Sequence, residues 1–210
     1  MSGDYFANHA RALRFPWSLY HRPLERSLAG FLTRVGAAGG RPRVLVIGGG
    51  FLHELPLVPE VVRLTVVDVD PRVTERLDRI GDPRVERCLT IAPNADLRPL
   101  GEFEGIYAKE VIEHIPAPEP YLAAIAAMLA PEGRLWLSTP NYGDAALPLL
   151  EATVLELVGR LSGYSRRDIH PSRFTADRLL SAMREAGLDE VEVTKTPLRL
   201  ALVGQGRRAA

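Results

Sequence analysis

The sequence has little of several features that mark special classes of protein. Its single cysteine, Cys88, excludes a disulfide within the 210 residues and fits a reducing compartment. The 26 basic and 26 acidic residues balance, and no long run of like charge points to a nucleic acid or a membrane surface as a partner. No signal peptide and no apolar run of about 18 residues is present. We therefore expect a cytoplasmic protein that binds neither nucleic acids nor membranes.

Close groups of metal ligands are also missing from the sequence. Zinc and similar ions are usually held by histidines, cysteines or acids at short, regular spacing. The histidines of this chain stand far apart, at His9, His21, His53, His114 and His170. On this ground the sequence predicts no metal site.

What the sequence does have is a regular alternation of short apolar runs and helical patterns. Residues 43–47 (RVLVI) and 64–69 (LTVVDV) are typical of strands buried on both faces, which are apolar at nearly every position. Asp70 and Pro71 suit the first positions of a helix, which residues 71–80 continue. Further strands are expected near residues 87–91, 105–108 and 134–138, and a further helix over residues 119–129. This order predicts an α/β fold with a mostly parallel sheet and helices on both faces.

Both ends of the chain add elements to this sheet. Residues 5–35 show helical periodicity, and Pro23 suits the first turn of such a helix. Near the other end, Thr175 is typical of a helix N-cap. Residues 191–195 and 198–203 can pair as a hairpin, so we expect the sheet to end in an antiparallel pair.

Three glycines, Gly48 to Gly50, follow the first strand directly. Residues without a Cβ atom allow a tight turn and let a ligand approach the backbone. Asp68 ends the next strand at the same edge of the sheet, where an acid can accept hydrogen bonds from ribose hydroxyls. A purely structural turn is one alternative. A nicotinamide dinucleotide site is another, but its motif needs a third glycine where His53 stands.

Five sequence segments follow one another along the chain: RVLVIGGG, VVDVDP, YAKEVIEHIP, MLAPEGRLWLSTPN and HPSRFTADRLLSAMREAGL. In this order they resemble the class I S-adenosylmethionine (SAM)-dependent methyltransferases over roughly residues 43–193. The resemblance is closest to the ubiquinone-biosynthesis and small-molecule natural-product group. The first two segments also resemble spermidine synthase, but the acid-rich catalytic loop of that family is absent at residues 108–111.

The resemblance implies a Rossmann-like, mostly parallel, seven-stranded sheet in one domain over residues 1–210. Its expected parts are an N-terminal helical cap (1–40), a cofactor-binding core (41–140), a helical insertion or lid (141–173) and a final helix with the hairpin (174–210). The implied cofactor is S-adenosyl-L-methionine. The implied reaction is methyl transfer to an oxygen or nitrogen of a small-molecule metabolite or natural product by in-line displacement.

Other readings stay open at this point. An apolar stripe on a helix expected at residues 144–161 suits either the sheet or a second subunit in a homodimer. The chain could also be a non-catalytic partner or scaffold with this fold, or an enzyme of this fold that performs another reaction.

The resemblance also assigns residues to the cofactor. It places the glycine backbone beside the amino-acid part, Asp68 on the ribose, Val69 against the adenine, and the backbone of Lys109 toward the methionine part. Asn94, where the family usually has an aspartate, still offers an amide oxygen to the adenine amino group. The complete set is Gly48, Gly49, Gly50, Asp68, Val69, Asn94, Ala95 and Lys109.

Two positions depart from the family pattern. Val46 stands where the family often has an acid that orients the amino-acid part, and Leu52 stands where its last glycine normally lies. Glu54 is a candidate to replace the missing acid by reaching the ammonium group of the cofactor. The alternative is an exposed acid at a helix start, where the helix dipole favours it.

His114 and His170 are the candidate catalytic bases, because an imidazole titrates near neutral pH. For His114 the alternative is a buried, structural histidine. Tyr142 and Tyr164 are candidates for an aromatic wall around the acceptor, with ordinary loop packing as the alternative. The N-terminal residues that could form a lid, or simply cover the sheet, are Tyr5, Trp17, Tyr20 and His21.

Overall fold

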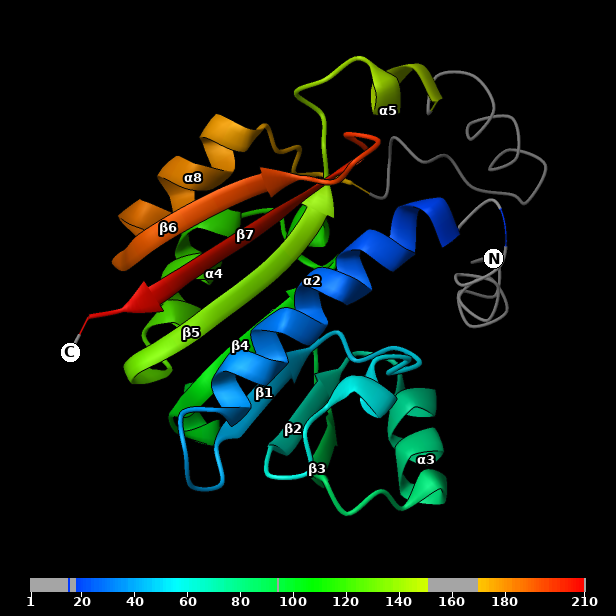
Figure 1. Cartoon of the computed structure of the whole chain (residues 1–210), viewed down its shortest axis with the longest axis vertical. Helices are drawn as coiled ribbons and strands as arrows, with labels where there is room; N and C mark the ends of the chain where they lie inside the picture. Colours follow the sequence, from blue (N-terminus) through cyan, green and yellow to red (C-terminus); the bar gives the residue numbers. More distant parts are fainter. Residues whose placement is uncertain (1–14, 16–17, 94, 151–169, 210) are drawn as a thin grey trace.

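A single seven-stranded sheet forms the centre of the fold (Figure 1). The computed structural model describes residues 15, 18–93, 95–150 and 170–209. The strands are β1 (Arg43–Ile47), β2 (Arg63–Asp68), β3 (Val85–Thr90), β4 (Phe103–Lys109), β5 (Leu129–Pro140), β6 (Leu188–Lys195) and β7 (Ala201–Arg208). They lie in the order β3-β2-β1-β4-β5-β7-β6. Neighbours from β3 to β5 run parallel, whereas β7 pairs antiparallel with β5 and β6. The mostly parallel sheet with a terminal hairpin is therefore confirmed.

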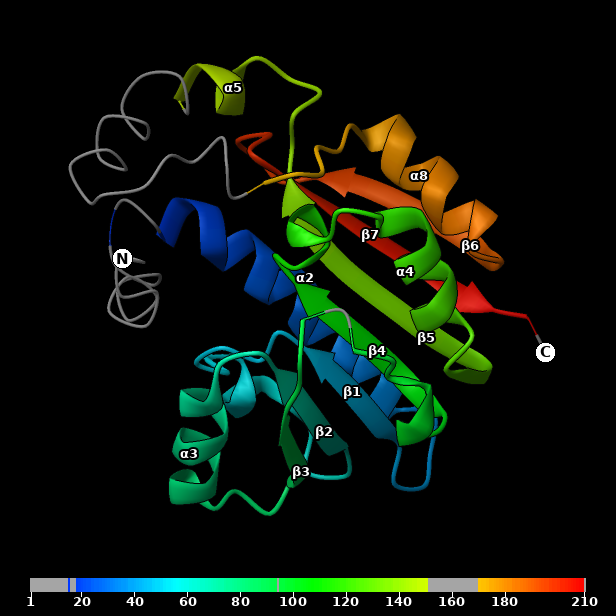
Figure 2. The ribbon, with the colours of Figure 1, turned by 180° about the vertical axis from the view of Figure 1, so that it is seen from behind.

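Helices cover both faces of this sheet (Figures 1 and 2). The α-helices are α2 (Ser18–Gly36), α3 (Pro71–Ile80), α4 (Pro118–Ala126), α5 (Ala146–Leu150) and α8 (Ala176–Glu185), and the 3₁₀ helices are η1 (Leu55–Leu57), η2 (Arg98–Leu100) and η3 (Ile112–His114). Apolar residues of α2 and α3 pack into one core cluster, and those of α4 and α8 into another. Within β1, Val44 and Val46 belong to the first cluster and Leu45 and Ile47 to the second. This strand is apolar throughout because both of its faces are covered. Among the described residues, no helix is long and apolar enough to cross a membrane.

The helix-start signals of the sequence act as predicted. The side chain of Asp70 accepts a hydrogen bond from the backbone N of Arg72 at the start of α3. Thr175 does the same for the backbone N of Arg178 at the start of α8. Gly81, just after α3, adopts a left-handed φ of 62°. Local side-chain and backbone preferences therefore set these boundaries.

Two helix boundaries differ from the sequence prediction. Pro23 lies inside α2 and not in its first turn, because the helix extends back to Ser18. Since proline has no N–H, the carbonyl of Leu19 lacks its usual helical donor. Leu129 begins β5 and does not end α4, because it pairs with Phe103 of β4. Strand pairing here outweighs the helical periodicity of the local sequence.

Two connections differ from what the sequence pattern indicates, and a third lies partly outside the described residues. The glycine turn leads into the short η1 and not into an α-helix, and prolines at positions 56 and 59 oppose helix extension. The hairpin turn is longer than predicted, with β7 starting at Ala201, whose backbone exchanges hydrogen bonds with Thr196. Of the helix expected at residues 144–161, α5 is described, whereas residues 151–169 lie outside the described residues.

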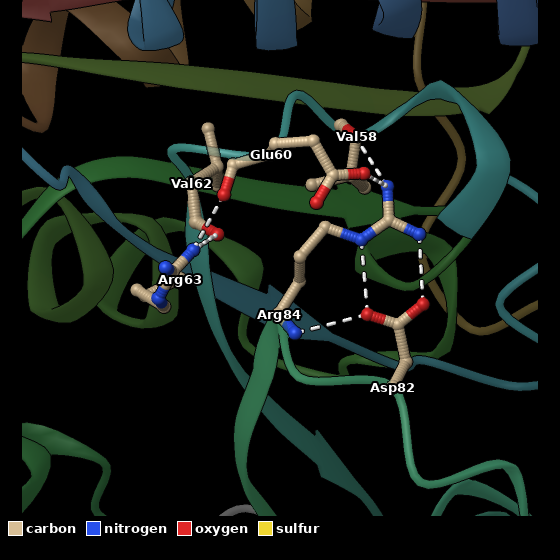
Figure 3. Close-up of polar contacts among 6 residues, drawn as sticks. All are labelled: Val58, Glu60, Val62, Arg63, Asp82 and Arg84. Carbon is tan, nitrogen blue, oxygen red and sulfur yellow. Dashed lines mark hydrogen bonds and ion pairs between the residues drawn. The ribbon is translucent and has the colours of Figure 1, made fainter.

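At the amino-terminal edge of the sheet, Arg84 joins separate segments of the chain (Figure 3). Its Nε and Nη2 atoms donate to the carboxylate of Asp82 at 2.9 and 2.7 Å, and its Nη1 donates to the carbonyl of Val58 at 2.6 Å. Arg63, the first residue of β2, donates to two carbonyls of the same connection. These contacts hold the connection between η1 and β2 against the start of β3, at the opposite edge from the glycine turn.

Candidate active site

Three of the predicted site segments meet at one edge of the sheet. The glycine turn follows β1, Asp68 ends β2 and Lys109 ends β4. Because β1 lies between β2 and β4 and runs parallel to both, the carboxyl ends of the three strands lie together. The strand order also reverses direction between β1 and β4, and open α/β sheets bind ligands at such a position.

The glycine turn needs its glycines for two different reasons. A Cβ atom on Gly48 would lie 2.5 Å from Cγ2 of Val111, and one on Gly49 would lie 2.4 Å from Cγ1 of Val66. Both distances are too short for real carbon atoms, so the packing around the turn excludes side chains. At Gly50, by contrast, no described atom lies within 4 Å of a Cβ, and the backbone has a φ of +49°. Gly50 itself is buried, but a side chain at this position would point into open space and not into protein atoms.

Leu52, the departure from the family's last glycine, keeps a left-handed backbone. Its φ is 45°, a conformation that glycine adopts readily and leucine rarely. Its side chain is buried in the core on the α2 face, and its backbone N donates to the carbonyl of Gly49 at 2.8 Å. The turn thus retains a glycine-like path, with leucine packing supporting the strained residue.

Asp68 couples the end of β2 to the glycine turn. Its Oδ2 accepts a hydrogen bond from the backbone N of Gly50, and its Oδ1 accepts one from the backbone N of Asp70, both at 2.9 Å. An ionised carboxylate can accept about four hydrogen bonds, so each oxygen can accept another from a hydroxyl. Beside it, Val69 is 56% exposed. A carboxylate for hydroxyls and an apolar surface for a flat ring therefore lie next to each other.

Glu54 and Lys109 form an ion pair next to this turn. Lys109 Nζ donates to Glu54 Oε2 at 2.8 Å, and the side chains of Lys109 and Glu54 are 19% and 2% exposed. The alternative of an exposed helix-start acid at Glu54 is therefore wrong, and Lys109 is an ion-pair partner and not a solvated side chain. Burial raises the pKa of Tyr107 well above 10.0, and the charge of Glu54 adds to this shift. Burial also raises the pKa of Glu25 on α2, an effect that Lys109 opposes.

The segment after β4 carries two acids that face other elements. Glu110 has a left-handed φ of 58°, and its carboxylate accepts hydrogen bonds from the hydroxyls of Tyr20 on α2 and Ser138 on β5. Glu113 is buried, and its Oε2 accepts a hydrogen bond from Thr139 Oγ1 at 3.1 Å. Burial raises the pKa of Glu113 well above 4.5, and the charge of Glu110 adds to the shift. Glu113 is therefore not a surface acid.

His114 and His170 lie side by side although 55 residues separate them in the sequence. Their ring centroids are 5.0 Å apart. The chain is held in this arrangement by Ser172, whose backbone N donates to the carbonyl of Glu113 and whose Oγ donates to the carbonyl of Ile115. The expectation that no histidines pair closely is wrong for these two, because contacts between distant segments bring them together.

Tyr142 is the third ring of this group. Its hydroxyl lies 2.7 Å from Nδ1 of His170. One potential ligand atom from each of Glu113, His114 and His170 lies within 4.8 Å of the other two. This cluster was not predicted, since it combines two residues of η3 with one from a distant segment. The YAKEVIEHIP segment contains two of its members and was the available signal.

Several predicted site residues fall outside this geometry. Ala95 is described and its backbone N donates to the carbonyl of Ala92, but Asn94 lies outside the described residues, as do Tyr5, Trp17 and Tyr164. Of the expected N-terminal lid residues, Tyr20 reaches the site through Glu110, and His21 packs edge-on against Tyr20 at 5.1 Å between ring centroids.

Sequence comparison identifies a protein family and relatives that this chain resembles. A family model described as a methyltransferase domain matches residues 20–193. A ubiquinone biosynthesis O-methyltransferase of Xanthomonas euvesicatoria is 30% identical over 170 residues, which cover 77% of this chain and 68% of that protein. The corresponding protein of Xanthomonas axonopodis is 29% identical over 177 residues, with the same two shares covered.

Solved structures share the fold. An N-methyltransferase, NodS of Bradyrhizobium japonicum in complex with S-adenosyl-L-homocysteine (SAH), has a TM-score of 0.62 and 22% identity, and 98% of each chain is covered. The magnesium protoporphyrin IX methyltransferase of Synechocystis with bound SAH has a TM-score of 0.66 and 16% identity, with 97% of this chain and 94% of that chain covered. At these identities the likeness concerns the fold alone, and it agrees with the Rossmann-like architecture described above.

Proposed function

The chain belongs to the class I SAM-dependent methyltransferases, with S-adenosyl-L-methionine as its cofactor, and from this premise we propose that it methylates an oxygen atom of a small-molecule acceptor. The sequence alone left oxygen and nitrogen open. The Xanthomonas relatives, which are named as ubiquinone biosynthesis O-methyltransferases, support oxygen. A metabolite or natural product is the proposed acceptor class.

The observation that carries the site proposal is the contact between Asp68 and Gly50. It supports an assignment in which one carboxylate holds the ribose hydroxyls while it also orders the glycine turn. The exposed Val69 is proposed to pack against the adenine, together with Ala95 and Asn94 at the end of β3. The adenosine part would then lie along the carboxyl ends of β2 and β3.

For the amino-acid part of the cofactor, we assign the glycine turn and the Glu54–Lys109 pair. The backbone of Gly48, Gly49 and Gly50 lies at the end of β1, and the ion pair lies beside it at the end of β4. The amino-acid part carries an ammonium and a carboxylate group. Glu54 can attract the first and Lys109 the second through charge-assisted hydrogen bonds. This assignment supplies the acid that Val46 does not provide.

The acceptor is assigned to the side of the site where His114 and His170 lie. Lys109 directly precedes the segment that carries Glu113 and His114, so the methyl group would face this cluster. The acceptor oxygen attacks the methyl carbon in line with the carbon–sulfur bond. That bond breaks, its electron pair stays on sulfur, and SAH forms as the acceptor loses a proton. Holding the two reactants about 3 Å apart in a dry site accounts for much of the rate in such a step.

The alternative of a non-catalytic scaffold rested on Val46 and Leu52. Leu52 keeps the left-handed backbone of the glycine that it replaces, and Glu54 places a buried acid beside the turn. Neither departure therefore gives a physical reason to expect loss of cofactor binding.

Calorimetric titration with SAM and SAH tests the proposal directly. Asp68→Ala should weaken SAH binding by about 10-fold or more, since it removes charge-assisted hydrogen bonds of about 1.5–3 kcal/mol. Asp70→Ala is the matched control, because its side chain caps α3 and should leave SAH affinity unchanged. No heat with either ligand from folded wild-type protein would overturn the proposal. The division into four chain segments, the cytoplasmic location and the homodimer stay predictions from the sequence.

A further inference from the structure

The short segment that precedes α8 passes the carboxyl end of β5 (Figures 1 and 2). The carbonyl of Phe174 accepts a hydrogen bond from the backbone N of Tyr142 at 2.9 Å, and the backbone N of Ser172 donates to the carbonyl of Glu113 at 3.1 Å. Ser172 and Phe174 are 3% and 0% exposed, whereas Arg173 between them is exposed. The backbone of Arg173 is therefore held from both sides, and its side chain lies on the solvent side of the segment.

The guanidinium group of Arg173 lies over the ring of Tyr142, with Cζ 5.2 Å from the ring centroid. The neighbouring Arg178 has a similar position over Phe174, at 4.8 Å, but it also donates to Glu119 Oε1 at 2.8 Å. Arg173 forms no ion pair with any acid in the part of the chain that the structure describes. Contact with a ring face orients a guanidinium group without using its N–H donors, so those of Arg173 are available to a ligand.

Tyr142 connects this arginine to the side of the site assigned to the acceptor. Its hydroxyl lies 2.7 Å from Nδ1 of His170, and the ring of His170 lies 5.0 Å from that of His114 between centroids. The four side chains thus form a continuous row from His114 to Arg173. A molecule whose reacting oxygen lies near His114 can therefore reach the guanidinium group along the ring of Tyr142.

We propose that Arg173 binds an anionic group of the acceptor, a carboxylate or a phosphate, and thereby selects acidic acceptor molecules for methyl transfer. This inference rests on the proposed function, which assigns the acceptor to the side of His114. The planar fork of an arginine can donate two parallel hydrogen bonds to either group. Arg173 is thus assigned as a specificity-determining residue, and a negatively charged small molecule is the acceptor class.

The acids of the site give the acceptor a preferred orientation. Glu113 is 1% exposed, and the carboxylate of Glu110 accepts a hydrogen bond from Ser138 at the end of β5. An anionic group placed deeper in the site would meet these acids where little water screens the repulsion. Beside the exposed Arg173 the same group keeps contact with water and has a positive partner. The anionic group is therefore expected to face outward and the reacting hydroxyl inward.

The test uses three probes that share one aromatic ring and differ in charge. Benzoate carries a carboxylate, phenyl phosphate carries a phosphate, and benzamide is a neutral molecule of nearly the same shape as benzoate. Each probe is titrated calorimetrically into the full chain, with and without saturating SAH. We expect at least one anionic probe to bind about 10-fold or more tightly than benzamide, because a hydrogen bond to a charged group is stronger than one to a neutral group. The tighter of the two anions identifies the group that Arg173 prefers.

Variants of the arginine separate its charge from its shape. Arg173→Gln should weaken binding of the anionic probe about 10-fold or more and leave the affinity for benzamide unchanged. Arg173→Lys keeps the charge but loses the planar fork, so its affinity should lie between those of the wild type and Arg173→Gln. Arg184→Gln is the matched control, because it removes the same charge from an exposed position in the last turn of α8. It should bind as the wild type does.

Circular dichroism checks that each variant folds. Equal affinity of the wild type and Arg173→Gln for the anionic probes would overturn the inference, as would an equal loss for benzamide, which would indicate a structural role. Parallel titration with SAH separates the two proposals. Folded protein that binds SAH but neither anion keeps the proposed function and overturns this inference. Protein that binds an anion through Arg173 but no SAH supports the anion site and overturns the proposed function.

Discussion

Lys109 Nζ lies 2.8 Å from Glu54 Oε2, so an ion pair joins the end of β4 to the segment that follows the glycine turn. These two residues come from different strand–loop connections, and the parallel pairing of β1 with β4 brings them together. The pair neutralises a carboxylate that is almost fully buried. It also places one charge of each sign at the edge of the sheet assigned to the amino-acid part of the cofactor.

Replacing one partner of this pair should cost more stability than replacing both partners together. Glu54→Gln or Lys109→Met leaves one charge behind, which costs about 3–5 kcal/mol for a fully buried pair. Because Lys109 keeps 19% exposure, we expect about 1–3 kcal/mol by urea denaturation. The double variant should lose less than the sum of the two single losses. Strictly additive losses would show that the pair is not coupled. SAH affinity should fall in all three variants.

Gly48→Ala should mainly lower the stability of the protein, whereas Gly50→Ala should mainly weaken cofactor binding. Gly48→Ala forces a Cβ to within 2.5 Å of Val111, and overpacking of this kind typically costs about 1–3 kcal/mol in addition to the strain of a positive φ. At Gly50 only the strain of a φ of +49° applies, about 1–2 kcal/mol. The methyl group of Gly50→Ala should instead obstruct the cofactor. Thermal unfolding and SAH titration of the two variants check this, and equal SAH affinity of Gly50→Ala and wild type would contradict the assignment.

Removing the Tyr20 hydroxyl should loosen the contact between α2 and the site. Tyr20 donates to Glu110, and a hydrogen bond to a charged group contributes about 1.5–3 kcal/mol. Because the contact is partly exposed, we expect Tyr20→Phe to lower the unfolding free energy by about 1 kcal/mol. Leu19→Ala is the control, since its side chain is 51% exposed and should change stability little. Equal effects of the two changes in urea denaturation would count against a specific role for the hydroxyl.

The Arg84–Asp82 pair should make stability depend on acid pH. The hydrogen bonds from Arg84 lower the pKa of Asp82 below 3.8. A carboxyl group whose pKa is lower in the folded state stabilises the protein above its unfolded pKa, and this contribution is lost as the pH falls through the folded value. Asp82→Asn should therefore cost about 1–2 kcal/mol at pH 7 and progressively less below about pH 3.8.

Asp96→Asn provides a matched control for that prediction. Asp96 and Arg98 have the same spacing in the sequence and the same kind of contact, but their side chains are 51% and 70% exposed. Solvent should screen this pair, so we expect no measurable loss of stability. Urea denaturation of both variants at pH 7 and pH 3 measures how the loss of stability depends on pH. An Asp82→Asn loss that stays constant between these values would contradict the prediction.

Much of the fold could be predicted because its signals are local. The strand of residues 43–47 is apolar at consecutive positions, and Asp70 and Thr175 cap their helices through hydrogen bonds within three residues. Glycines directly after a buried strand and an acid at the end of the next one indicated the cofactor edge in the same way. The prediction failed at Leu129, where strand pairing outweighed the apparent helical pattern. After Leu52, prolines limit the connection to a short 3₁₀ helix.

The sequence by itself therefore determined the alternating α/β order, the helix starts and the edge of the sheet where Gly50 and Asp68 lie. Only the tertiary structure decided that Glu54 pairs with Lys109 and that His170 lies 5.0 Å from His114. The physical reason is the range of the interactions. Helix caps and turns depend on neighbours along the chain, whereas these pairs depend on strand order and on contacts such as that of Ser172 with Glu113. The histidines stand far apart in the sequence, which argued against a metal site, but folding brings His114 and His170 into contact.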